Sequence, residues 1–62
     1  MEQIWLSRPQ LADRLGVSIA TVAQWASRGT GPRYARLAGG KVRYLLVDVV
    51  AWEQEQMVST RD

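Results

Sequence analysis

The stretch LGVS ends one helix and begins another within four residues, and this junction constrains the fold more than any other feature of the chain. Ser7 and Gln10 have the spacing of a capping box, and Pro9 falls in the first turn, where its missing N–H costs nothing. Gly16 supplies the left-handed residue that commonly ends a helix. The pattern therefore predicts a helix over residues 7–16 that cannot continue into the next one.

A second helix is predicted from Ser18, its N-cap, to Gly29, which ends it. At 100° per residue its two sides differ in character. The side expected to pack on the first helix carries Ile19, Val22, Trp25 and Ala26, and the other side carries Ala20, Thr21, Gln24, Ser27 and Arg28. The second side is small and polar, and it contains no acid.

A β-hairpin is predicted over residues 34–45, with Gly39 and Gly40 supplying the positive φ angles of a two-residue turn. In this register Arg36 lies directly opposite Arg43 on an open face. The core face collects Ala35, Leu37, Val42 and Tyr44. Like charges across a ladder are destabilising, so a bound anion would compensate the arginine pair. The alternatives are that both arginines splay into water, or that a three-residue loop changes the register.

A third helix is predicted from Val49 to about residue 57. Asp48 has the side chain of an N-cap, and Val49 and Trp52 fall on the side that faces the core. Residues 59–62 are expected to fray.

The 62 residues are expected to form one domain with a small core. Cysteine and histidine are absent, so neither a disulfide nor a zinc site of the usual type is available, and packing that includes Trp5, Trp25 and Trp52 must suffice. The sequence offers no nucleophile paired with a general base, and LAGGK lacks the spacing of a phosphate-binding loop. We expect neither an enzyme nor a bound metal or cofactor.

Basic residues cluster in one part of the chain. Residues 28–43 carry five basic side chains and no acid, which gives +5; the whole chain is +2, so the remainder is −3. Such a cluster is typical of a protein that binds a polyanion, and the alternative is a solvated loop.

The two helices with their short connection have the pattern of a helix-turn-helix, whose second helix enters the major groove of DNA. The alternative is a helical corner that only packs. The outer side of the second helix favours DNA binding, because it is small, polar and free of carboxylates. Gln24 could pair with adenine, Thr21 could contact a base edge or a phosphate, and Ala20 could contact a thymine methyl group.

The segments LGVS, GTGPRY, VRY and DVVAW, in this order and spacing, resemble the winged helix-turn-helix proteins of the MerR superfamily. The similarity is greatest to the short phage excisionases, also called recombination directionality factors, and to AlpA-like regulators. It implies a mainly α fold with a small β-hairpin as the wing. The implied recognition-helix contacts are Ser18, Ala20, Thr21, Gln24 and Arg28, and the implied wing or backbone contacts are Arg33, Arg36, Gly39, Gly40, Lys41 and Arg43. The apolar residues 45–47 depart from the pattern and indicate either burial under the third helix or contact with another protomer or protein.

The expected function is DNA binding with bending of an attachment site, as an excisionase that directs an integrase toward excision. The residues after Trp52 offer no apolar heptad for the coiled coil of a MerR-type sensor. A small AlpA-like transcriptional regulator is the alternative, and a module that binds an acidic protein is a third hypothesis. The expected partners are double-stranded DNA with attachment-site repeats, an integrase and further copies bound head to tail. No membrane segment is present, and we expect the protein in the bacterial host cytoplasm, on the nucleoid.

Overall fold

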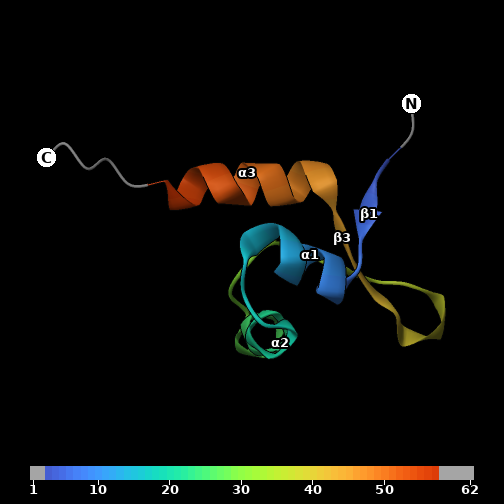
Figure 1. Cartoon of the computed structure of the whole chain (residues 1–62). Helices are drawn as coiled ribbons and strands as arrows, with labels where there is room; N and C mark the ends of the chain where they lie inside the picture. The colour runs from blue at the N-terminus through green and yellow to red at the C-terminus, as the bar shows by residue number, and fades with distance from the viewer. Residues whose placement is uncertain (1–2, 58–62) are drawn as a thin grey trace, which may run out of the picture.

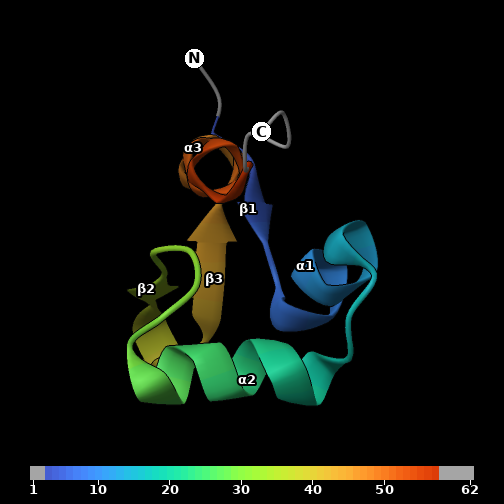
Figure 2. The same cartoon turned by 90° about the vertical axis from the view of Figure 1, so that its left-hand side faces the viewer.

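Three helices and a three-stranded antiparallel sheet make up residues 3–57, the part of the chain that the computed structural model describes. In Figure 1, α3 lies on one side of the molecule and α2 on the opposite side, with α1 between them, and the view in Figure 2 keeps this order. The elements are β1 (Trp5–Leu6), α1 (Arg8–Leu15), α2 (Ile19–Arg28), β2 (Ala35–Arg36), the 3-10 turn η1 (Ala38–Gly40), β3 (Val42–Leu45) and α3 (Leu46–Gln56).

The first two helices begin and end as their caps predict. Ser7 Oγ accepts a hydrogen bond from the backbone N–H of Gln10, and the Gln10 side chain accepts one from the N–H of Ser7. Gly16 and Gly29 end α1 and α2 in the left-handed conformation, with φ of 72° and 75°. Their positive φ angles suit glycine, because a Cβ disfavours this region. The helix-turn-helix geometry therefore follows from local sequence.

The sheet contains a strand that the sequence did not indicate. β1 pairs with β3, with Trp5 opposite Leu45 and Leu6 opposite Tyr44. Because β2 pairs with the other edge of β3, the strand order is β1-β3-β2. β1 has only two residues, too few for an alternating pattern to be recognised. It fixes the N-terminal segment beside the wing, so the fold is a winged helix-turn-helix with a three-stranded sheet.

The predicted register of the hairpin is wrong by one residue. Arg36 lies opposite Val42, and Ala35 lies opposite Arg43. The loop has three residues, Ala38–Gly40, and the backbone N–H of Leu37 donates to the carbonyl of Lys41 at 2.7 Å. Both loop glycines do have positive φ, 79° and 78°. A shift of one residue moves a side chain to the other face of the sheet, so Arg36 and Arg43 are not a facing pair.

The third helix begins earlier than predicted. It starts at Leu46, directly after β3, and the backbone N–H of Leu46 donates to the carbonyl of Ile4 at 2.8 Å. Asp48 therefore lies in the first helical turn and is not the N-cap; there its carboxylate still suits the positive end of the helix dipole. The predicted frayed tail, residues 59–62, lies outside the described residues.

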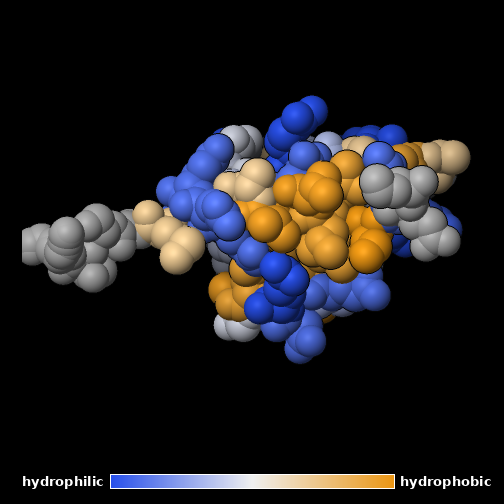
Figure 3. Space-filling model, turned by 90° about the horizontal axis from the view of Figure 1, so that it is seen from above, coloured by the Kyte–Doolittle hydropathy of each residue, from blue (hydrophilic) through white to orange (hydrophobic). Residues whose placement is uncertain are grey.

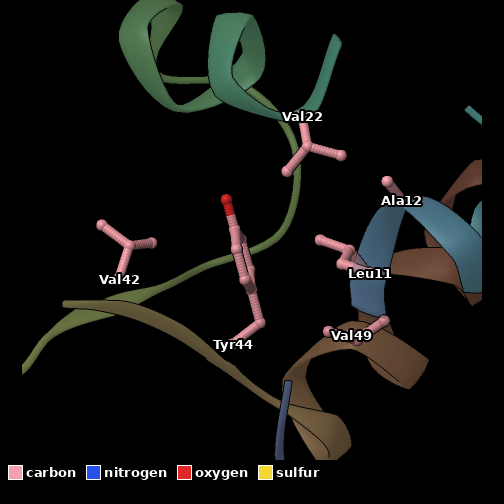
Figure 4. Close-up of a cluster of buried hydrophobic side chains, with 6 residues drawn as sticks. All are labelled: Leu11, Ala12, Val22, Val42, Tyr44 and Val49. Carbon is pink, nitrogen blue, oxygen red and sulfur yellow. The ribbon is translucent and has the colours of Figure 1, made fainter. Parts of the chain in front are cut away.

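The core is a cluster to which all three helices and β3 contribute. Tyr44, 1% exposed, stands up from β3 toward Val22 of α2, with Leu11 of α1 beside it (Figure 4). Trp25 and Trp52 join α2 to α3, with ring centroids 5.4 Å apart. The buried hydrophobic residues are Leu11, Ala12, Val22, Val42, Tyr44 and Val49.

Three residues expected in the core are exposed. Ile19 is 51% exposed because it lies in the first turn of α2, at the end of the contact with α1. Leu37 is 41% exposed because the shifted register removes it from the core face. Trp5 is 39% exposed because it lies on the edge strand β1.

Candidate nucleic-acid interface

The outer side of α2 carries the residue types expected of a helix that reads DNA. Ala20, Gln24, Ser27 and Arg28 are exposed, and the described residues form no salt bridge on this helix. Arg28 lies in the last turn, where its positive charge also suits the helix C-terminus. The side chains are short toward the start of the helix, which allows the backbone to approach base edges closely. The assignment of these residues as DNA contacts remains a prediction.

Ser18 and Thr21 are bonded to each other at the start of α2. Their hydroxyl oxygens lie 2.9 Å apart, and Ser18 Oγ also accepts a hydrogen bond from the backbone N–H of Thr21 at 3.1 Å. Ser18 is therefore first of all the N-cap of α2. Each hydroxyl keeps some capacity for a further hydrogen bond. Any DNA contact by Ser18 or Thr21 therefore has to coexist with the hydrogen bonds of this N-cap.

The segment after α2 folds back over Trp25. The backbone N–H of Thr30 donates to the carbonyl of Trp25 at 2.8 Å, and Gly31 has φ of 80°. A Cβ at Gly31 would lie 2.9 Å from Trp25 Cβ, so this backbone can approach the tryptophan only as glycine. The fold-back holds Arg33 at the end of the recognition helix.

A cleft of about 310 Å³ opens between the end of α2 and the fold-back segment. It is lined by Ala26, Gly29, Thr30, Gly31, Pro32, Arg33 and Tyr34. Thr30 is a polar residue of this cleft that the sequence did not single out; its position between two glycines just after a helix end is the signal that could have found it. Tyr34 leans on the buried Tyr44, with ring centroids 5.8 Å apart. The cleft places a hydroxyl and a guanidinium beside the recognition helix.

The wing carries basic side chains on both of its faces. Arg36 shares the face of its partner Val42, which is also the face of Tyr44, and Arg43 points to the opposite face. Arg36 and Lys41 are exposed. Arg43 is half-buried, and its Nη1 donates to the carbonyl of Val42 at 2.8 Å. Because Arg36 and Arg43 do not face each other, repulsion between them does not require a bound anion. Arg36 and Lys41 instead place exposed positive charge near the tip of the wing.

The only salt bridge within residues 3–57 lies away from the basic cluster. Arg14 of α1 donates from Nε to Glu53 Oε2 at 2.7 Å and from Nη2 to Glu53 Oε1 at 2.9 Å. These hydrogen bonds, with the attraction between the charges, lower the pKa of Glu53 and raise the pKa of Arg14 against a small opposing effect of desolvation. The five basic residues between 28 and 43 therefore have no carboxylate partner in the described part of the chain.

The recognition helix and the wing lie on one side of the molecule. Both lie at the end opposite α3 in the view of Figure 1 and in the quarter-turned view of Figure 2. DNA has one phosphate charge per about 1.7 Å of axis, so a surface with several unpaired basic residues and a groove-sized helix matches its shape and charge. The two elements that carry the predicted contacts therefore lie at the same end of the molecule.

Other kinds of site find no support in the described residues. Residues 3–57 contain no group of three or more His, Cys, Asp or Glu side chains that could hold a metal ion. Within the same residues, every helix is too short or too polar to cross a membrane.

Comparison with known proteins supports the interpretation from geometry. A family model described as a helix-turn-helix domain matches residues 5–57. Its match covers β1, both helices of the motif, the wing and α3. Searches of curated proteins and of solved structures found no match.

Proposed function

Because the chain belongs to the helix-turn-helix domain family, and is thus a small DNA-binding protein, we propose that it acts as a phage-type excisionase. In this role it binds repeats in an attachment site sequence-specifically, bends the DNA and directs a partner integrase toward excision. The protein itself performs no chemistry, since strand cleavage and exchange belong to the integrase.

One observation carries the DNA-binding part of the proposal: α2 and the wing lie at the same end of the molecule (Figures 1 and 2), and their basic residues form no salt bridge within residues 3–57. A single module of this kind covers roughly 600–1,000 Å² of its own surface. Five clustered basic residues neutralise about five phosphates at most, so the affinity is modest and falls steeply with salt. Specific binding then gains from neighbouring copies or from a larger partner on the same DNA.

Support for the finer role comes from the resemblance of the segments LGVS, GTGPRY, VRY and DVVAW to short excisionases. An AlpA-like regulator of prophage or mobile-element genes would use the same surface, so the two roles differ in their consequence for the bound DNA. An excisionase changes the direction of recombination, whereas a regulator changes transcription from a nearby promoter.

The deciding experiment is a recombination assay with the integrase of the mobile element that carries this gene. We expect the protein to raise the yield of excision from the paired attachment sites and to suppress the reverse reaction. If the protein changes transcription beside its binding site but leaves recombination unaltered, the regulator is correct.

Point variants test whether α2 and the wing form the DNA-binding surface. Arg43→Ala is expected to weaken binding to all sequences and to flatten the salt dependence, whereas Gln24→Ala is expected to relax preference at one base position. Asp13→Ala, on the exposed side of α1, serves as the control that leaves both unchanged. Parent-like DNA binding by both interface variants would contradict the docking of α2 and the wing.

A further inference from the structure

The outer surface of α3 carries an apolar patch that nothing in the described chain covers. Ile4, Val47 and Val50 are 56%, 66% and 37% exposed. The backbone hydrogen bond from Leu46 to Ile4 holds the segment before β1 beside the start of α3. Figure 3 shows apolar residues gathered over α3 and beside it. We call Ile4, Val47 and Val50 the α3 patch.

The apolar residues of the patch are not a consequence of core packing. Val49 faces the core and is fully buried, so Val47 and Val50 project to other sides of the helix. Val47 and Val50 are three residues apart and therefore neighbours on one helix face. A helix that needed only to cover the core would carry polar residues at these positions.

The patch lies on the side of the molecule opposite the recognition helix. α3 and α2 are at opposite ends in both Figure 1 and Figure 2. When α2 sits in a DNA groove, the α3 patch points away from the duplex and stays accessible. A protein that contacts it can therefore stand on the same DNA complex.

The same geometry argues against a second copy as the occupant. Two copies joined through their α3 patches would direct their recognition helices in opposite directions, so one duplex could not receive both. The patch measures on the order of 300 Å², well below the roughly 800 Å² that each partner contributes to a standard interface. Such a contact needs help from another attachment, which shared DNA supplies by raising the effective concentration.

The charge of α3 indicates the chemistry of the partner. α3 contains Asp48, Glu53 and Glu55 and no Lys or Arg. Glu53 is paired with Arg14, which leaves Asp48 and Glu55 as the acids of α3 that form no salt bridge within residues 3–57. Two copies would oppose acid to acid, whereas a surface of apolar side chains bordered by Lys or Arg would be complementary.

We propose that the α3 patch docks a DNA-bound protein whose contact surface is apolar with a basic border. The inference rests on the proposed function, in which that protein is the integrase. The basic border suits a protein that itself binds DNA. DNA binding by one face and partner binding by the opposite face then occur in one complex.

The test measures how strongly this protein and the integrase help each other to bind one attachment-site fragment, by gel shift with and without integrase. The wild type is expected to raise integrase affinity about 5- to 150-fold, the usual range of coupling between sites. Val47→Ser and the double variant Val47→Ser/Val50→Ser are expected to reduce this factor to near 1 without changing binding to DNA alone. Val47→Ile, which keeps the apolar surface, should retain it.

Charge variants give an independent control. Glu55→Lys is expected to reduce the coupling several-fold, while Asp13→Lys, the same change of charge on the exposed side of α1, should not. Thermal melting of each variant confirms that it is folded, and the single Val47→Ser variant serves if the double variant is unstable.

The outcomes separate the two proposals. If the wild type assists the integrase and the serine variants assist it equally, the α3 patch is not the docking surface, while the excisionase role stands. If the wild type gives neither coupling nor stimulated excision, both proposals fall. If the serine variants instead lose cooperative binding of several copies in the absence of integrase, the occupant is a second copy and the inference is wrong.

Discussion

Gly31→Ala is expected to be among the most destabilising single-methyl additions in this chain. A left-handed backbone costs a non-glycine residue about 1–2 kcal/mol. The added Cβ would also lie 2.9 Å from Trp25 Cβ and 3.2 Å from Trp25 Cε3, and relieving such an overpacked contact costs about 1–3 kcal/mol. The neighbour Trp25 Cβ belongs to a helical residue and cannot rotate away. We therefore expect a loss of about 2–5 kcal/mol in the free energy of unfolding.

This loss is large for a chain of 62 residues, whose total stability is expected to be about 3–9 kcal/mol. The melting temperature should fall by about 8–40 °C, since each kcal/mol shifts it by roughly 4–8 °C in a domain of this size. The assay is urea unfolding followed by tryptophan fluorescence, which reports on the contact between Trp25 and Trp52.

Gly29→Ala is the matched control for this prediction. Gly29 has φ of 75° and no atom within 4 Å of the added Cβ, so it incurs only the backbone cost of about 1–2 kcal/mol. The difference between the two variants isolates the approach of the fold-back segment to Trp25. Equal destabilisation by both substitutions would refute the close packing at Gly31.

Two further predictions concern the cap of α2 and the bridge between α1 and α3. Ser18→Asp should leave stability within about 0.5 kcal/mol of the wild type, because Asp caps as well as Ser. It should lower DNA affinity in a gel shift, because a carboxylate at the start of the recognition helix would repel the phosphates of bound DNA. Unchanged affinity would remove the start of α2 from the interface. Glu53→Gln should lower the melting temperature at pH 7, because it breaks the bidentate bond to Arg14. The pKa of Glu53 is lowered in the folded state, so its stabilising contribution is complete above the ordinary carboxyl range and is lost as pH falls through the lowered pKa. Melting curves of the two proteins should therefore converge at low pH, and a difference that persists there would contradict the role of the charge.

Local signals predicted the helix-turn-helix because each boundary is set by neighbouring residues. Ser7, Ser18, Gly16 and Gly29 all act as the caps that the sequence indicates. The start of α3 could not be predicted in this way. It is fixed by a hydrogen bond from Leu46 to Ile4, which lie far apart in the sequence, and Asp48 offered a local cap signal that this contact overrides.

The side chains that share a face of the wing could not be predicted from the sequence. Two glycines support a two-residue turn and a three-residue loop equally well, and one residue decides which side chains share a face. The pairing of β3 with β2 and β1 selects the register in which Val42 and Tyr44 face the core and Leu37 does not. The charge of the wing was predictable from composition. That Arg36 and Arg43 lie on opposite faces is known only from the strand pairing.

The salt dependence of DNA binding tests most directly the claim that α2 and the wing form the DNA-binding surface. The logarithm of the binding constant should fall with the logarithm of salt concentration with a slope of about −0.9 per phosphate contact, so up to about −4.5 for five contacts. Arg36→Ala/Lys41→Ala, which removes two exposed basic residues of the wing, should reduce the magnitude of the slope by about 1.8 and weaken binding to every sequence. A slope identical to that of the wild type, or no binding by the wild type at low salt, would contradict the account.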